Sequence, residues 1–231
     1  ADQEFRIYRD AQWGDLIELA LTDGRQYRSD QACGDATLNL DPPCAELTEP
    51  ARTMLGEAQE QWLLDTLGAS TARWNVIGNQ VILADATFNG AVLNYDQWDG
   101  YPAERERLLQ AFADAEVQNL VVVTGDIHLA AVAQLRAGER GVGTPVGVEF
   151  VGTSISSDGL IGDELTDVLK SFPDLVDAEL AHRGYCLHTV TPERWTAEYR
   201  IVADVDDPNS DVTLYGTYVV EAGSNTVAKV G

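Results

Sequence analysis

The sequence predicts an α/β fold, in which a layered core of strands and helices ends in an antiparallel edge. Three observations support this prediction. Apolar, β-rich segments alternate with segments of helical pattern through most of the chain, and Asn119–Thr124 (NLVVVT) is typical of a strand covered on both faces. Apolar and polar residues then alternate from Tyr185 to Val220 around a turn, which indicates antiparallel hairpins. With 231 residues, the chain can form one sizeable core or at most two small domains.

The first predicted elements lie between Trp13 and Ala84. Trp13–Thr22 (WGDLIELALT) is an apolar run that predicts a buried strand, whereas Gln26–Pro50 is polar and rich in Asp and Pro, which predicts a long loop. Gly56–Leu67 has clustered apolar residues and an acidic first turn, so we expect a helix. Trp74–Ala84 (WNVIGNQVILA) is β-rich and apolar and predicts a second buried strand.

The middle of the chain continues this alternation. Asp85–Tyr101 is aromatic and rich in Asn, Asp and Gly, and predicts a loop. Pro102–Ala115 predicts a helix, because proline is favoured at the first helical position and two glutamates would lie in the first turn. The strand Asn119–Thr124 places Gly125-Asp126-Ile127-His128 at its C-terminal end, and a short helix after His128 would complete the alternation.

The C-terminal part begins with Val146–Thr153, a predicted strand that runs into four residues rich in serine. Asp163–Ala181 is expected to be mainly helical. The hairpins turn at Thr191-Pro192-Glu193-Arg194, and an acidic loop, Asp204–Asp211, leads to a last strand near Tyr215–Val220. The chain shows no internal repeat, no low-complexity segment and no glycine-rich phosphate loop.

The charge balance limits the classes of partner. Asp and Glu total 38 against 15 Lys and Arg, which gives a net charge of −23. Such a chain repels nucleic acid and anionic membranes, so we expect no nucleic-acid binding. A phosphate substrate would need a local reversal of this field, for which bound cations are the obvious source. Adaptation to salt or a high-GC genome explains the acidity equally well, so acidity alone does not identify a metal enzyme.

No apolar run approaches the roughly 18 residues of a membrane helix, so the sequence predicts no membrane span. The first six residues (ADQEFR) have neither a basic region nor an apolar core, so no signal peptide is visible. A mature secreted chain would look the same.

Two of the three cysteines, Cys33 and Cys44, flank a polar loop that contains prolines. Neither belongs to a C-x-x-C pair, which argues against a zinc knuckle. A disulfide between them would suit an oxidising compartment and would stabilise the fold by about 2–3 kcal/mol. Two free thiols are the alternative.

Asp126 and His128 are the strongest candidate metal ligands. Carboxylate oxygen and imidazole nitrogen commonly hold a hard cation, and two residues apart on an extended or turning chain their side chains can point to the same side. Gly125 would allow close backbone approach. The alternative is an aspartate that caps a helix beside an incidental histidine.

Other polar residues follow the predicted strands, where ligands of open α/β sheets collect. Asp23 could place a carboxylate near a metal, and the planar guanidinium of Arg25 could bind a phosphate oxygen. A turn with a surface ion pair is the alternative for both. Asn79 is a polar residue inside an apolar run, and is either a ligand or a strand amide with ordinary hydrogen bonds. Gly152–Ser156 lacks the spacing of a nucleophile elbow.

Several blocks together resemble the PhoD-like phosphatases. The sequence DGRQYR at 23–28 is similar to that family's D-x-R-Q-Y-R segment, and RTMLG with Gln59, Trp62 and Leu63 resembles its next block. WNVIGNQ at 74–80, DQWDGYP at 96–102, TGDIH at 124–128 and VEF with SISS at 148–157 match further family blocks in the same order. The resemblance covers most of 13–200 and is specific as a set.

This resemblance implies a metal-dependent phosphomonoesterase or phosphodiesterase, that is, an alkaline phosphatase or phosphodiesterase that is secreted or lies at the cell surface or in the periplasm. It implies Ca²⁺ and Fe³⁺ as cofactors, phosphate esters as substrates and an αββα metallophosphatase core. Asp126 and His128 match the family's last metal-ligand motif, and Asp23 and Arg25 match an active-site block. The family motifs also contain Asn79, Asp96 and Asp99, which we expect to be ligands or walls of the site.

The chain departs from the family in one respect. Members begin with a β-sandwich and a first metallophosphatase half that carries an early metal-binding Asp, G-D-x-x-x-Y and D-D-H-E elements and an iron-binding cysteine. These are absent from the sequence, and Cys186 occurs too late to be that cysteine. We therefore expect residues 1–231 to be the C-terminal part of one metallophosphatase domain that requires a separate N-terminal chain. The alternative is a non-catalytic structural or binding half-domain.

Overall fold

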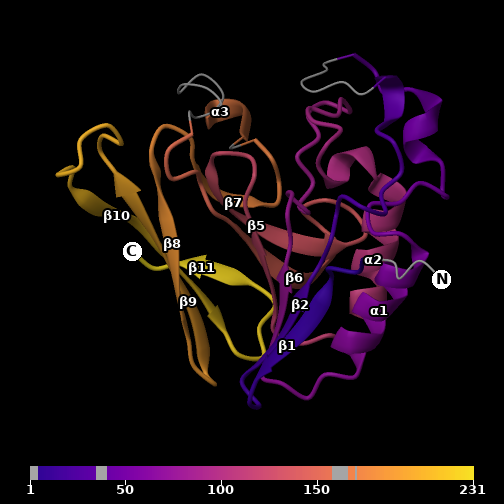
Figure 1. The fold of residues 1–231 in the computed structure, drawn as a ribbon, viewed down its shortest axis with the longest axis horizontal. Coiled ribbons are helices and arrows are strands. Elements are labelled where there is room, and N and C mark those ends of the chain that lie inside the picture. The colour runs from indigo at the N-terminus through magenta and orange to yellow at the C-terminus, as the bar shows by residue number, and fades with distance from the viewer. Residues whose placement is uncertain (1–4, 35–40, 158–165, 170) are drawn as a thin grey trace.

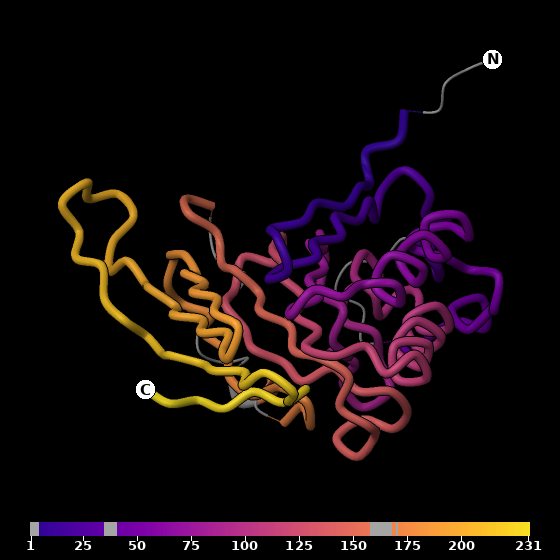
Figure 2. Tube along the Cα trace, turned by 90° about the horizontal axis from the view of Figure 1, so that it is seen from below, coloured from indigo at the N-terminus to yellow at the C-terminus, as the bar shows by residue number. Residues whose placement is uncertain are grey.

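The computed structural model describes residues 5–34, 41–157, 166–169 and 171–231. In this part of the chain, two β-sheets pack against each other, and helices cover the outer face of the larger sheet (Figure 1). Seen from below in Figure 2, the C-terminal strands form a layer on one side and the helices lie on the other. The predicted fold class, a mixed sheet with antiparallel C-terminal hairpins, is confirmed.

The larger sheet has the strand order β1-β2-β3-β4-β6-β5-β7 among the described residues. Its centre is parallel: β2, β3, β4 and β6 run in one direction, and β1, β5 and β7 are antiparallel to their neighbours. The strands are β1 (Arg9–Trp13), β2 (Ile17–Leu21), β3 (Trp74–Gly78), β4 (Leu120–Thr124), β5 (Ala130–Ala137), β6 (Thr144–Val151) and β7 (Leu175–Glu179).

The smaller sheet is antiparallel throughout, with the order β11-β10-β9-β8. Its strands are β8 (Arg183–Val190), β9 (Arg194–Val202), β10 (Val212–Glu221) and β11 (Val227–Lys229). The turn between β8 and β9 is the predicted one, closed by the Thr191 N–H, which donates to the carbonyl of Arg194 over 2.9 Å.

The helices α1 (Glu57–Gly68) and α2 (Pro102–Asp114) connect β2 to β3 and β3 to β4. Both were predicted, and α2 begins at Pro102 because the missing N–H of proline costs no hydrogen bond at that position. Each helix returns across the sheet, so both begin near the carboxyl ends of β2, β3 and β4 and end near their amino ends. We call these two borders of the larger sheet the carboxyl edge and the amino edge. The remaining short elements are α3 (Thr166–Leu169) and the 3₁₀ turns η1 (Ala32–Gly34), η2 (Ala45–Thr48) and η3 (Trp98–Gly100).

Apolar contacts hold the layers together. The helices pack on the larger sheet through residues such as Leu63, Leu108 and Phe112. Between the two sheets, the rings of Trp74 and Trp195 lie 5.8 Å apart, and both residues are buried. Burial of apolar surface contributes about 25 cal/mol per Å² and is the main term that stabilises this arrangement.

Two predicted elements differ from the structure at their ends. Trp13–Thr22 is not one strand: the chain turns at Gly14, whose φ is +56°, and Trp13 pairs with Ile17 across the β1–β2 hairpin. Trp74–Ala84 forms a strand only as far as Gly78, after which the Asn79 side-chain amide donates to the carbonyl of Val81 and bends the chain. In both cases a turn residue lies inside an apolar run.

Two predicted helices are wrong in the described residues. The segment after His128 is β5, whose residues are buried because β6, β7 and both neighbouring layers enclose it. In Asp163–Ala181, residues 158–165 and 170 lie outside the described part, only Thr166–Leu169 is helical, and Leu175–Glu179 forms β7. Pro173 cannot continue a helix, and the residues after it pair with β5 instead.

No helix of the described residues is long and apolar enough to cross a membrane.

Candidate active site

Polar loops leave the larger sheet at its carboxyl edge. Asp23 to Arg25 follow β2, Asn79 follows β3, and Gly125 to His128 follow β4. Because β2, β3 and β4 are parallel neighbours, these loops emerge side by side.

The loop after β4 has an uncommon backbone. Asp126 has φ +72° and His128 has φ +59°, both in the left-handed region that few non-glycine residues occupy. The Ile127 N–H donates to the carbonyl of Gly125 over 2.9 Å, which closes a tight turn. Strain of this kind, on the order of 1–3 kcal/mol per residue, is concentrated at functional sites.

Arg25 links the loop after β2 to two carboxylates. Its guanidinium donates two hydrogen bonds to Asp96, of 2.7 and 2.8 Å, and its Nη2 lies 3.7 Å from Asp126 Oδ1. The hydrogen bond to Asp96 is the main reason why the pKa of Arg25 is raised. The structure therefore brings together three of the residues selected from the sequence: Arg25, Asp96 and Asp126.

Two further donors converge on Asp96. Arg28 Nη1 and Gln31 Nε2 lie 2.7 and 2.6 Å from Asp96 Oδ1. Burial by itself would raise the pKa of Asp96, but the hydrogen bonds from Arg25 and Arg28 outweigh burial and hold the pKa below its usual value. Asp96 is therefore ionised at neutral pH and keeps both arginines in place.

Gln97 orients the carboxylate of Asp126 through a hydrogen bond. Its Nε2 donates to Asp126 Oδ2 over 3.0 Å, and its Oε1 accepts a hydrogen bond of 2.5 Å from the Ile82 N–H. Gln97 is buried, whereas the Asp126 side chain is 41% exposed. The amide thus fixes one carboxylate oxygen and leaves the other facing Arg25.

Asp23 is buried beneath Arg25. Its Oδ1 accepts the N–H groups of Arg25 and Gln26, at 3.0 and 3.2 Å, and the Gln59 side chain holds its backbone from both sides. Asp23 Oδ2 is buried and has no hydrogen-bond partner among the described residues. An unpartnered buried carboxylate oxygen is costly, so this atom fits a role as a cation ligand.

Asn79 lies at the same edge. Its N–H donates to the carbonyl of Val123 over 2.9 Å, and its side-chain amide donates to the carbonyl of Val81 over 2.6 Å. Its Oδ1 is 3.5 Å from the hydroxyl of Thr22. Within the part of the chain that the structure describes, this long contact is the one hydrogen bond of the amide oxygen.

The contacts of Asp99 in the described structure lie outside this cluster. Arg105 donates to Asp99 and, over 2.9 Å, to Asp85, while the Ala86 N–H donates to Asp99 over 3.1 Å. Burial would lower the pKa of Arg105, but attraction to Asp99 and Asp85 outweighs burial and raises it. In the described structure, Asp99 therefore pairs with Arg105 and makes no hydrogen bond to Arg25, Asp96 or Asp126.

A buried carboxylate on β6 fixes the end of β4. Glu149 accepts hydrogen bonds from Thr124 Oγ1 at 2.6 Å and from the N–H groups of Leu83 and Ala84 at 2.9 and 2.8 Å. Burial raises its pKa despite these bonds. Thr124 immediately precedes the Gly125–His128 turn, so Glu149 ties that turn to the loop after β3.

His128 is held through its backbone. Its carbonyl accepts a hydrogen bond of 2.9 Å from Arg183 Nη1, which also contacts Thr153. His182 lies close by, since Thr153 Oγ1 is 3.3 Å from the carbonyls of both histidines.

Cys33 and Cys44 form the expected disulfide. It closes the segment that follows Arg28 and Gln31, two donors of the Asp96 cluster. Residues 35–40 of this segment lie outside the described part.

Sequence reasoning did not select Gln97, Glu149, Arg28 or Gln31 as site residues. Arg28 and Gln31 belong to the block that contains Arg25, and Gln97 lies beside Asp96, so adjacency to a selected residue is the signal that could have identified them. Glu149 is the one acidic residue in an otherwise apolar strand, which is itself a signal.

The described residues contain no group of three or more His, Cys, Asp or Glu side chains that could hold a metal ion. Asp126, His128 and Asp23 offer carboxylate and imidazole donors but do not form such a group among the described residues. Oxygen and imidazole donors suit a hard cation, so the residues that are present fit a metal whose shell is completed by other groups.

Comparisons with known proteins show which family the chain is similar to. A family model described as PhoD-like phosphatase matches residues 1–199. The chain is 37% identical to alkaline phosphatase D of Bacillus subtilis (strain 168), over 98% of this chain and 40% of that protein. A solved structure titled "Structure of PhoD" matches with a TM-score of 0.90 and 37% identity, over 99% of this chain and 44% of that one. The chain thus spans less than half the length of these relatives.

Proposed function

Because this chain belongs to the PhoD-like phosphatase family, we propose that it supplies part of the active site of a metal-dependent phosphoesterase that hydrolyses phosphate mono- or diesters. The observation that carries the proposal is the position of Arg25 between Asp96 and Asp126 at the carboxyl edge. A guanidinium beside a candidate metal ligand is where a phosphoryl group could contact both.

Arg25 would hold the phosphate. The Arg25 guanidinium donates two N–H groups to the Asp96 carboxylate in this structure. Phosphate offers the same pair of oxygen acceptors, so it can take the place of the carboxylate. Asp96, Arg28 and Gln31 would position the guanidinium before substrate arrives. The amino-terminal ends of α1 and α2 lie at this edge and favour an anion there.

Asp126 and His128 would bind the cations, together with Asp23, whose Oδ2 has no partner among the described residues. The family suggests Ca²⁺ and Fe³⁺. When bound, such cations would polarise the phosphoryl group and lower the pKa of an attacking water. Gln97 would keep the Asp126 carboxylate oriented, and Asn79 would complete the wall.

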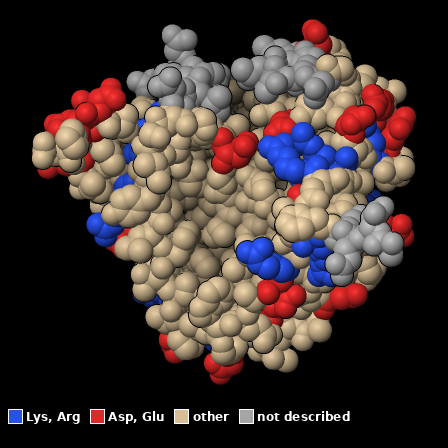
Figure 3. Space-filling model, in the orientation of Figure 1, with Lys and Arg blue, Asp and Glu red and all other residues tan. Residues whose placement is uncertain are grey.

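Residues 1–231 would form the C-terminal part of one metallophosphatase domain, completed by a separate N-terminal chain. The coordination groups of the described residues are incomplete, and the chain covers 40% and 44% of its two relatives. β8 is an edge strand that exposes Tyr185 and Leu187, and Figure 3 shows a hollow lined by uncharged side chains between the two sheets. An edge strand of this kind can pair with another segment.

The disulfide suits a secreted protein or one at the cell surface, where the substrate would be an extracellular phosphate ester. A non-catalytic half-domain is the competing function. It shares the fold and the disulfide but needs neither cation nor phosphate.

The test is hydrolysis of bis(p-nitrophenyl) phosphate and p-nitrophenyl phosphate with Ca²⁺ and Fe³⁺. We expect the 231-residue chain alone to be inactive, and to become active when it is combined with an N-terminal polypeptide of a family member. Asp126→Asn should then lower kcat at least 100-fold, because it removes a charged ligand. Glu221→Gln, far from the site in β10, is the matched control.

Two results would contradict the proposal in different ways. Robust turnover by the chain alone would refute the need for a second polypeptide. Absence of turnover in the combined protein, with both polypeptides folded and bound to each other, would favour the non-catalytic function.

A further inference from the structure

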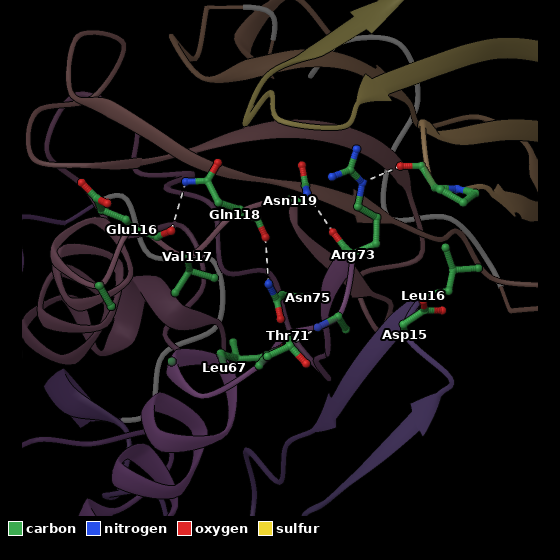
Figure 4. A pocket seen from close by; sticks show the side chains of 15 residues that line it. Asp15, Leu16, Leu67, Thr71, Arg73, Asn75, Glu116, Val117, Gln118 and Asn119 are labelled. Carbon is green, nitrogen blue, oxygen red and sulfur yellow. Dashed lines mark hydrogen bonds between the residues drawn. The ribbon is translucent and has the colours of Figure 1, made fainter.

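A cavity of about 800 Å³ lies at the amino edge of the larger sheet, opposite the candidate active site. The ends of α1 and α2, the β1–β2 turn, the beginnings of β3 and β4 and Pro192 of the β8–β9 turn form its walls (Figure 4). It contains none of the residues proposed above for catalysis, so it requires an explanation of its own.

Two helix ends make this cavity electronegative. α1 ends at Gly68 and α2 at Asp114, both at the cavity, and neither helix has a basic residue in its last turn. The carbonyl groups of a helix C-terminus carry partial negative charge and favour a cation. Asp15 and Glu116 also line the cavity and add two carboxylates.

The cationic side chain among the lining residues is Arg73. Its Nε donates to the carbonyl of Pro192 over 2.6 Å, which directs the guanidinium to the wall formed by the β8–β9 turn. One arginine directed to that wall does not balance two carboxylates and two helix ends, so the cavity keeps an excess of negative charge.

The buried side-chain amide of Asn75 gives separate evidence that the cavity binds a ligand. It is 5% exposed, and its Nδ2 donates to the carbonyl of Gln118 over 2.8 Å. Its Oδ1 is buried and has no hydrogen-bond partner among the described residues. The amide cannot be reversed, because the oxygen would then face the Gln118 carbonyl. Figure 4 shows the oxygen on the side of the amide away from Gln118, towards Leu67 and Thr71.

An unpartnered acceptor at the floor of an electronegative cavity calls for a ligand with N–H groups and positive charge. We propose that this cavity is a binding site for a small organic cation, an alkylammonium. Its nitrogen would face Asn75 and the two helix ends, and its hydrocarbon part would lie against Leu16, Leu67 and Val117. This site does not depend on the proposed phosphoesterase function.

The test is a titration of the ¹⁵N-labelled 231-residue chain with n-butylammonium chloride, followed by amide chemical shifts. The matched probes are n-butanol, which has the same hydrocarbon without the charge, and sodium butyrate, which has the opposite charge. We expect n-butylammonium to bind at least tenfold more tightly than either probe, with the largest shifts at Leu67, Asn75 and Val117. Equal binding of n-butanol, or shifts confined to other regions, would overturn the proposal.

A pair of variants at Gln118 tests the charge requirement. Gln118 is exposed and lines the cavity, and its Nε2 donates to the carbonyl of Glu116 and to no other group of the described residues. Gln118→Lys places a tethered ammonium at the cavity and should weaken n-butylammonium binding at least tenfold. Gln118→Met has a similar length without charge and should bind as the wild type does.

Asn75→Leu removes the acceptor and should also weaken binding. Because this change also deletes the hydrogen bond to Gln118, thermal unfolding is used first to check that the Asn75→Leu variant is folded. If it is not, the two Gln118 variants decide whether the cation binds in this cavity. Unchanged affinity in Gln118→Lys would refute the site.

Discussion

The two edges of the larger sheet are built from the same strands and helices but have opposite electrical character. At the carboxyl edge α1 and α2 begin, and Arg25, Arg28 and Gln31 converge on one carboxylate. At the amino edge both helices end without a basic residue in the last turn, and a buried amide oxygen of Asn75 has no partner among the described residues. The direction of the helices therefore favours anions at the edge where the helices begin and cations at the edge where they end.

The edges also differ in the kind of contact that supports them. At the carboxyl edge, acidic residues near the beginnings of the helices are held by other elements: Glu60 pairs with Arg107, and Glu104 accepts hydrogen bonds from the N–H groups of Met54 and Leu55. Hydrogen bonds between distant segments also join the amino edge, such as those from Trp74 Nε1 to the carbonyl of Thr191 and from Asn119 Nδ2 to the carbonyl of Arg73, but the described residues there form no buried ion pair. Loss of a charged partner should therefore cost much more stability at the carboxyl edge, and this contrast can be measured.

The largest effect is expected from Arg105→Leu. Arg105 is 7% exposed at its side chain and pairs with Asp99 and Asp85, so its removal leaves the buried Asp99 carboxylate without its cationic partner, while Asp85 keeps its pair with Arg140. The free energy of unfolding should fall by about 3–5 kcal/mol, measured by urea denaturation. Arg194→Leu, which breaks an ion pair between half-exposed side chains, should cost less than about 1 kcal/mol. Similar losses of unfolding free energy in both variants would contradict the expected difference between the two edges.

Glu104 should make the stability of the carboxyl edge depend on pH. Burial raises its pKa from 4.5 to about 7, so between these values the folded chain keeps a proton that the unfolded chain releases. Stability should therefore fall as pH rises from 4.5 to 7, by roughly 3 kcal/mol at 1.4 kcal/mol per pH unit, and level off above pH 7.

The contribution of Glu104 is isolated by comparison with Glu104→Gln. In this variant, the fall in the free energy of unfolding between pH 4.5 and 7 that Glu104 causes should be absent. Glu106→Gln, on the exposed side of the same helix, should keep it. A slope that is identical in all three proteins would show that Glu104 titrates normally.

Loss of the disulfide should be the next largest effect. Replacing both Cys33 and Cys44 by serine should lower the free energy of unfolding by about 2–3 kcal/mol, because the loop of the unfolded chain is no longer closed. Reduction of the wild-type protein should produce the same fall in thermal midpoint. If reductant also lowers the thermal midpoint of the serine variant, the effect of reduction on the wild type does not come from the Cys33–Cys44 disulfide.

Gln97→Leu should weaken cation binding without removing a ligand. If Asp126 binds a cation, the loss of its hydrogen bond from Gln97 should lower affinity about 10- to 100-fold, measured by calorimetric titration with Ca²⁺. Gln110→Leu on the surface of α2 is the control. If Asp126→Asn weakens Ca²⁺ binding and Gln97→Leu does not, Gln97 has no positioning role; if the wild type binds no Ca²⁺, the metal site itself is in question.

The smallest effects test the helix ends directly. Ala115→Lys adds a cation where α2 ends and should stabilise the protein by about 0.3–1 kcal/mol, whereas Glu57→Lys replaces an anion with a cation where α1 begins and should destabilise it by up to about twice that amount. Both positions are exposed, so 1 M salt should reduce both effects. If both variants change the free energy of unfolding in the same direction, the two edges do not prefer opposite charges.

The sequence predicted the elements whose pattern is local. The helix at Pro102 and the hairpin at Thr191–Arg194 follow from proline, acidic residues and alternation within a few positions. β5 and β7 were missed because their stability comes from pairing with each other and β6, which no window of sequence contains. The short apolar run after His128 suits a helix or an enclosed strand equally well, and only the neighbours decide.

The candidate site was predictable to a similar degree. Asp23, Arg25 and Asp126 were placed at strand ends by the sequence, and the structure brings Arg25 close to Asp126. The support from Gln97 and Glu149 could not be derived, because each reaches a loop that is distant along the chain. These contacts depend on the sheet order, which becomes known only with the fold.

The left-handed backbone at Asp126 and His128 has a consequence for how substitutions at these positions are tolerated. A β-branched residue is disfavoured there whatever its chemistry, because its side chain collides with the backbone at positive φ. A survey of all replacements would therefore rank these two positions as intolerant even in a chain that binds no ion. Asparagine, which adopts this conformation with little strain, is the replacement that separates the two causes: tolerance of asparagine indicates a backbone requirement, and intolerance indicates a requirement for the carboxylate or the imidazole.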